Sequence, residues 1–161
     1  MDFEKRLEKA IERGKHQSTA RAQAEALKAL SQRDLRRLYA EYRLELSERI
    51  EACLRQMADH IPGFRLETVV GERGWGASAS RDDISLLGDR SRASTFSRLE
   101  IVVRPLSEAN LLEVAAKGTV RDRELFNRSQ YQRLDEADLT SFHNVIDLWV
   151  LEFAEAYATE S

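Results

Sequence analysis

The sequence has little of several residue types that mark special protein classes. It contains one cysteine, Cys53, with two prolines and seven glycines in 161 residues. One cysteine cannot form an internal disulfide, and so few prolines and glycines argue against an all-β fold rich in tight turns. No apolar run approaches the roughly 20 residues that span a bilayer. These shortages leave a helix-rich soluble domain as the expected class.

An excess of positive charge is also lacking. The chain has 25 Lys and Arg against 28 Asp and Glu, and residues 131–161 alone hold one basic and seven acidic side chains. Proteins that neutralise nucleic-acid phosphates normally show a basic face, so we expect no nucleic-acid partner, and no membrane partner. The N-terminal residues are charged and lack the apolar stretch of a signal peptide, so the cytoplasm is the expected location.

The first 60 residues predict two helices. Residues 2–30 have apolar positions at helical spacing, but 14–19 contain no apolar residue, so we expect a break or a mobile segment there. A second helix is predicted over 32–60, ending before Pro62. Its length of about 43 Å exceeds the diameter of about 39 Å expected for a compact domain of this size. Its apolar stripe is Leu35, Tyr39, Tyr42, Leu46, Ile50, Cys53 and Met57.

From residue 64 the apolar period changes from near 3.6 to 2, which indicates strands. Glycines at 71, 74 and 76 favour a hairpin or bulge between the first two, and Pro105 ends the third. Residues 88–95 are polar and predict a loop. A final helix is predicted over 136–158, capped by Asp135. The expected strands are 64–70, 75–79, 96–104 and 111–120, with 124–131 left open as a fifth.

This order predicts an α+β fold with two N-terminal helices, an antiparallel meander of four to five strands, and a long C-terminal helix packed on the sheet. We expect one domain over residues 1–161, in which 1–30 form an N-terminal helical arm. Short connections between consecutive strands are the reason for expecting a meander.

The last helix has more apolar residues than one packing partner requires. Ile146, Trp149 and Phe153 share one half of the helix, whereas Leu148 and Leu151 fall on the other half among polar residues. Single surface leucines are normal, so these two need no partner. The alternative is that the long N-terminal helix pair or another copy of the chain covers them. Together with the overlong second helix, they favour a homodimer with Leu148 and Leu151 in the interface.

The sequence predicts no catalytic residue, metal site or cofactor. Its three histidines are isolated from one another, and an i,i+4 surface hydrogen bond explains His143 with Asp147. The adjacent carboxylates of Asp82 and Asp83 are interpreted as a solvated turn. Cys53 is interpreted as an inert thiol in an apolar stripe.

Two groups of residues are candidates for binding a small ligand. Trp75, Tyr131 and Trp149 are expected near a pocket between the sheet and the last helix. Arg98 and Lys117 belong to a ladder of opposite charges on neighbouring strands, which suits a solvated face. If a ligand or second copy covered that ladder, its residues and Arg128 would form a polar binding surface.

Five stretches resemble those of an uncharacterised bacterial protein family of about this length. They are residues 71–77, 99–105, 115–119, 126–128 and 146–152. The resemblance extends over nearly the whole chain and implies no activity or site. The overlong second helix, the two-sided apolar last helix and the lack of a catalytic cluster lead us to expect a non-enzymatic protein–protein interaction module acting as a homodimer. The alternative is a small-ligand-binding domain or enzyme with a pocket between the sheet and the C-terminal helix.

Overall fold

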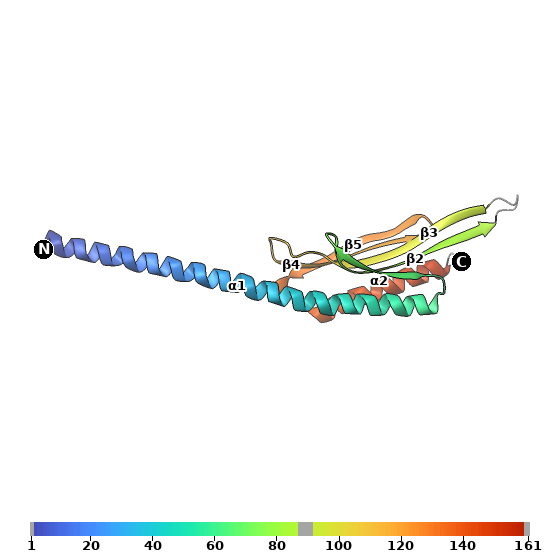
Figure 1. The fold of residues 1–161 in the computed structure, drawn as a ribbon, viewed down its shortest axis with the longest axis horizontal. Helices are drawn as coiled ribbons and strands as arrows, with labels where there is room; N and C mark the ends of the chain where they lie inside the picture. Colours follow the sequence, from blue (N-terminus) through green and yellow to red (C-terminus); the bar gives the residue numbers. More distant parts are fainter. Residues whose placement is uncertain (1, 87–91, 160–161) are drawn as a thin grey trace. The chain divides into compact units, whose positions relative to one another are not determined.

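The computed structural model describes residues 2–86 and 92–159, apart from the side chains of 27–30, 85, 86, 92 and 93. The chain divides into two compact units, Met1–Arg37 and Leu38–Ser161. The element order confirms the predicted α+β fold (Figure 1). It runs α1 (Phe3–His60), β1 (Arg65–Gly71), β2 (Gly74–Leu86), β3 (Arg92–Val103), β4 (Leu111–Val120), β5 (Arg123–Arg133), a 3-10 turn η1 (Leu134–Glu136) and α2 (Leu139–Thr159).

The two predicted N-terminal helices are joined into one element. α1 is a 58-residue helix, so the predicted break at 14–19 and the predicted boundary near Ser31 are both helical. Each weak helix former at 14–19 destabilises the helix by about 1 kcal/mol or less. Costs of this size do not end a helix when no cap or proline is present in the segment. Within the first unit, we call residues 3–26 the arm; all their side chains are exposed.

In the second unit, the five strands form one sheet in the order β1-β2-β3-β4-β5, and every neighbouring pair is antiparallel. The meander is confirmed, and the segment left open as a fifth strand is β5. β2 and β3 are longer than predicted, since their register continues from Trp75↔Val103 to Leu86↔Arg92. Residues 92–95 of the predicted loop therefore belong to β3, and 88–91 lie outside the described residues.

Gly71 and Gly74 form the predicted hairpin between β1 and β2. They pair with each other across a two-residue turn. Their φ angles are 148° and 135°, values that residues other than glycine rarely adopt. A Cβ atom on Gly74 would also lie 2.3 Å from the Val103 carbonyl oxygen of β3. Glycine is thus required at position 74 by both its backbone angle and its close neighbour strand.

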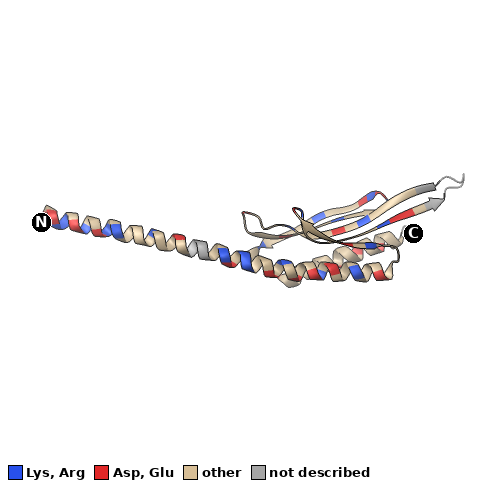
Figure 2. Ribbon diagram, viewed as in Figure 1, with Lys and Arg blue, Asp and Glu red and all other residues tan. Residues whose placement is uncertain are grey.

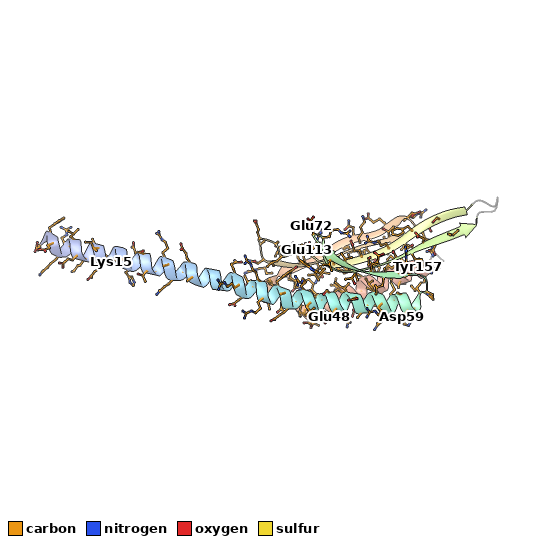
Figure 3. The ribbon with its side chains drawn as sticks, in the orientation of Figure 1. Lys15, Glu48, Asp59, Glu72, Glu113 and Tyr157 are labelled. Atoms are coloured by element: carbon orange, nitrogen blue, oxygen red, sulfur yellow. The ribbon has the colours of Figure 1, made fainter. Side chains whose placement is uncertain are left out.

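Both helices of the second unit cover the same face of the sheet (Figure 1). Figure 3 shows Glu48 and Asp59 on the side of α1 that faces away from the sheet. Alternate strand residues point to the covered face and are buried there, because side chains alternate along a strand. The largest fully buried side chains are Phe142, Phe153, Leu46, Ile50, Leu54, Leu99, Ile101, Leu112, Leu134, Ile146, Val103 and Val114.

The last helix begins three residues later than predicted. Asp138, not Asp135, caps it: the Asp138 carboxylate accepts a hydrogen bond from the Thr140 backbone N–H at 3.0 Å. The Asp138 backbone N–H in turn donates to the Gln132 side-chain oxygen at 2.7 Å. This bond ties the start of α2 to the end of β5, so α2 runs back under the sheet.

Candidate functional site

The exposed side of α2 carries the two leucines that the sequence assigns to an interface. Its exposed positions are spaced by four and three residues, as expected for one face of a helix. Leu148 and Leu151 are 63% and 64% exposed at its centre. The surplus of apolar residues predicted for this helix is therefore present on its surface. We define the outer face of α2 as Asn144, Leu148, Leu151, Glu155 and Ala158.

A groove of about 420 Å³ lies along one flank of this face, between α2 and β5. It contains four of the eight residues singled out from the sequence, two as ligand contacts and two as interface residues. Both sets of candidates thus meet in this groove. Its lining residues are Arg128, Gln130, Val145, Leu148, Trp149, Leu151, Glu152 and Glu155.

Arg128 crosses this groove and is held by three contacts. Its guanidinium donates two hydrogen bonds to the Glu152 carboxylate, at 2.7 and 3.1 Å, and lies 5.0 Å from the centre of the Phe126 ring. The forked geometry of a guanidinium fits both carboxylate oxygens at once. The pair compensates the charges of Arg128 and Glu152, whereas Glu155 adds a further carboxylate to the lining of the groove.

A second groove of about 490 Å³ lies on the other flank, between α2 and the C-terminal part of α1. Here the two helices run parallel, because Arg49 contacts Asp147 while Met57 and Ala154 further along line the same groove. Leu151 lines both grooves and so forms the ridge between them. The outer face of α2 is a leucine ridge with a hollow on each side.

The second groove holds a polar cluster that the sequence did not reveal. Arg49 donates hydrogen bonds of 3.1 and 2.6 Å to the Asp147 carboxylate, and the Cys53 thiol donates one of 3.3 Å. Partial burial works to raise the pKa of Asp147, but the hydrogen bonds from Arg49 and Cys53 outweigh it and hold that pKa below its usual value. Asp147 therefore stays ionised as the acceptor of both donors.

Cys53 is a protonated thiol in this cluster. Burial, followed by the hydrogen bond to Asp147, raises its pKa to about 11. Because the thiolate is the reactive form, the prediction of an unreactive thiol agrees with this geometry. Asp147 bonds Arg49 and Cys53 instead of the predicted partner His143, whose Nε2 atom is buried, lacks a hydrogen-bond partner and lies 3.7 Å from the Glu45 carboxylate.

Trp75 lies away from both grooves, between β2 and α1. The Arg43 guanidinium stacks 4.3 Å from its ring centre, and the Tyr39 ring meets it edge-on at 6.5 Å. The Tyr39 hydroxyl donates a 2.6 Å hydrogen bond to the Arg104 carbonyl oxygen, and burial raises its pKa to about 12. These contacts fill the space beside Trp75 and give it a packing role.

Arg98, Lys117 and Tyr131 lie on the opposite face of the sheet. Glu100 stands between the first two: it is the cross-strand neighbour of Lys117, and Arg98 and Arg73 contact its carboxylate at 3.1 and 3.2 Å. The predicted charge ladder is present there as a solvated surface. Because alternate residues of β5 point to opposite faces, Tyr131 is separated from Arg128, and the structure does not join Trp75, Tyr131 and Trp149 in one pocket.

Asp83 is another residue whose role the sequence did not show. The predicted solvated turn at residues 81–83 is part of β2. The Asp83 carboxylate accepts a 2.7 Å hydrogen bond from the Tyr157 hydroxyl and a 2.8 Å contact from Arg81. Tyr157 comes from the end of α2, so this cluster ties α2 to the sheet and has a structural role.

Comparisons with known proteins add no relative: no family model, curated protein or solved structure matches this chain. Among the described residues, no three His, Cys, Asp or Glu side chains converge as a metal site would require. None of the described helices has both the length and the apolar character needed to cross a bilayer.

Proposed function

We propose that this protein is a non-enzymatic protein–protein interaction module that acts as a homodimer through the outer face of α2. The observation that carries the proposal is the pair of leucines, Leu148 and Leu151, more than 60% exposed on a ridge between two grooves. Fully burying a leucine side chain is worth about 1.5–3 kcal/mol. Two leucines from each copy would thus contribute a substantial part of a dimer's stability.

A second copy fits this surface because two pairs of opposite charges on its rim are already compensated. Arg49 pairs with Asp147 on one flank and Arg128 pairs with Glu152 on the other. These four side chains therefore add no unpaired charge to the contact, and the exposed Glu155 carboxylate at the end of the face is the like charge that two copies must keep apart. A two-fold interface also uses the same patch on both partners, so a leucine ridge can meet the partner's groove twice.

The test is a double substitution on the ridge with a matched control. Light scattering of the wild-type protein should give about twice the chain mass of 18.5 kDa. Leu148→Arg with Leu151→Arg should give the mass of one chain, because the arginines place charge in the interface. Leu44→Arg is the control, since Leu44 is 59% exposed on α1 and lines neither groove. A wild-type monomer, or a double variant that keeps the dimer mass, refutes the proposal.

A bacterial cytoplasm is the proposed location. The resemblance to a bacterial family supports the bacterial origin. The free thiol of Cys53 supports the cytoplasmic location, because reducing compartments keep such thiols unpaired.

One observation favours the alternative of small-ligand binding. The groove between α1 and α2 combines an apolar wall with Arg49, Asp147 and Cys53 at one end. Such a combination is typical of ligand pockets, although this one is open. A small molecule that raises the melting temperature of the wild type and not of Arg49→Gln would support the alternative. A ligand effect that survives in Arg49→Gln would argue against this groove as the site.

A further inference from the structure

The arm carries an apolar stripe that is exposed to water and therefore adds no packing energy to the helix. Phe3, Leu7 and Ile11 are 74%, 47% and 50% exposed, and every other side chain of the arm is exposed too. Isolated helices are marginal in water, because most helix stability in proteins comes from packing an apolar face. Gly14 weakens this one further, since glycine costs about 1 kcal/mol relative to alanine inside a helix. A partner that covered this stripe would therefore stabilise the arm.

The stripe occupies one side of the arm. At about 100° per residue, Phe3, Leu7 and Ile11 fall within about 80° of the helix circumference. Ala10 and Gly14 fall beside them on the same side, so a second helix can approach closely there. An apolar side of this width matches the contact surface of a helix pair.

Charged residues of opposite sign flank the stripe. Glu4 and Glu8 lie on one side of it, with Lys15 one turn beyond Ile11 on that same side, and Arg6 and Arg13 lie on the other. Figure 2 shows both signs of charge along this part of α1. Flanking charges of this kind set partner choice and orientation in helix pairs.

The arrangement of charges identifies a second copy in parallel orientation as the complementary partner. In a parallel pair, the left flank of one helix faces the right flank of the other, which places Glu4 and Glu8 alongside Arg6 and Arg13 of the second copy. In an antiparallel pair, equal flanks face each other, and the two glutamate rows would repel. The same residues thus favour one orientation and disfavour the other.

We propose that the arms of two copies pair in parallel and in register through Phe3, Leu7 and Ile11. This inference rests on the proposed homodimer, because three apolar positions make too short a stripe to hold two free chains together. Within a dimer the second arm is tethered, which gives it an effective concentration in the millimolar range. Pairing would then stabilise the helix that each arm forms.

Engineered cysteines test both register and orientation in the full-length protein. In a Cys53→Ser background, Ala10→Cys and Gly14→Cys each place a thiol within the stripe. Lys5→Cys is the matched control, because position 5 points away from it. With oxidised glutathione, the first two variants should form a disulfide-linked dimer at least about tenfold faster than the control. In an antiparallel pair, only one of positions 10 and 14 can lie next to the same position of the second copy. Cross-linking at both positions therefore identifies the parallel orientation.

Charge reversal tests the flanks. Glu4→Lys with Glu8→Lys in the Ala10→Cys protein should slow cross-linking several-fold, and adding Arg6→Glu with Arg13→Glu should restore it. Cross-linking at 10 and 14 no faster than at 5, or an unchanged rate after the first reversal, overturns the arm pairing. Light scattering separates this from the proposed function: a dimer whose arms fail to cross-link refutes the arm pairing alone, whereas a wild-type monomer refutes the homodimer.

Discussion

Arg49 and Asp147 join the two helices that cover the sheet. The guanidinium of Arg49 on α1 donates hydrogen bonds of 3.1 and 2.6 Å to the Asp147 carboxylate on α2, although the two residues are 98 positions apart in the chain. Because Cys53 donates to the same carboxylate, Asp147 is the acceptor on which this helix–helix contact depends.

Asp147→Asn should lower the free energy of unfolding by about 1 kcal/mol. The pair is forked and hydrogen-bonded, but about a third or more of each side chain is exposed, so solvent screens much of its Coulomb energy. Urea denaturation measures the difference. Glu51→Gln is the matched control, because it removes only the exposed i,i+4 pair with Arg55 and should change stability by about 0.3 kcal/mol or less. Equal effects of the two substitutions would contradict this prediction.

The lowered pKa of Asp147 leads us to expect a loss of stability in acid. Its pKa is lowered in the folded protein, so its contribution is complete above the unfolded-state pKa of about 3.9. That contribution is lost as the pH falls through the lower folded-state pKa, because protonation favours the unfolded chain. The free energy of unfolding of the wild type should therefore fall more steeply below about pH 4 than that of Asp147→Asn. Parallel curves for the two proteins would show that Asp147 does not titrate with folding.

Cys53 should react slowly with iodoacetamide. With a pKa of about 11, its thiolate fraction at pH 8 is roughly two-hundredfold below that of an ordinary thiol with a pKa of about 8.5. Mass spectrometry follows the alkylation. The comparison thiol is Lys5→Cys in the Cys53→Ser background, an exposed position outside the apolar stripe of the arm, which should react at the ordinary rate. Similar rates for the two thiols would mean that the native cysteine is neither buried nor hydrogen-bonded as described.

Gly74→Ala should destabilise the protein more than Gly71→Ala. Both glycines have positive φ, which costs a side chain about 1–3 kcal/mol. Only at Gly74 would the new Cβ also collide with a neighbouring strand, at the Val103 carbonyl oxygen, whereas Gly71 has open space around it. Thermal unfolding of the two variants measures the difference, and a lower melting temperature for Gly71→Ala than for Gly74→Ala would contradict the β2–β3 register.

Much of the fold follows from local patterns along the chain. The alternation within β1 and β4 and the turn glycines at 71 and 74 predict neighbouring antiparallel strands, because short connections leave little choice of partner. The limits of elements were harder to predict. The segment at 14–19 lacks good helix formers yet is helical, and residues 92–95 are polar yet pair with β2, since cross-strand hydrogen bonds there do not depend on apolar side chains.

The sequence by itself determined the order of elements, the meander and the excess of apolar residues on the last helix, because periodicity and turn residues act over a few positions. Only the tertiary structure decided which distant side chains meet. It placed Tyr131 and Arg128 on opposite faces of one strand, and it set Leu151 between two grooves. It also brought Cys53 to Asp147, 94 positions away. Such contacts depend on how α1 and α2 lie side by side on the sheet, which no local pattern contains.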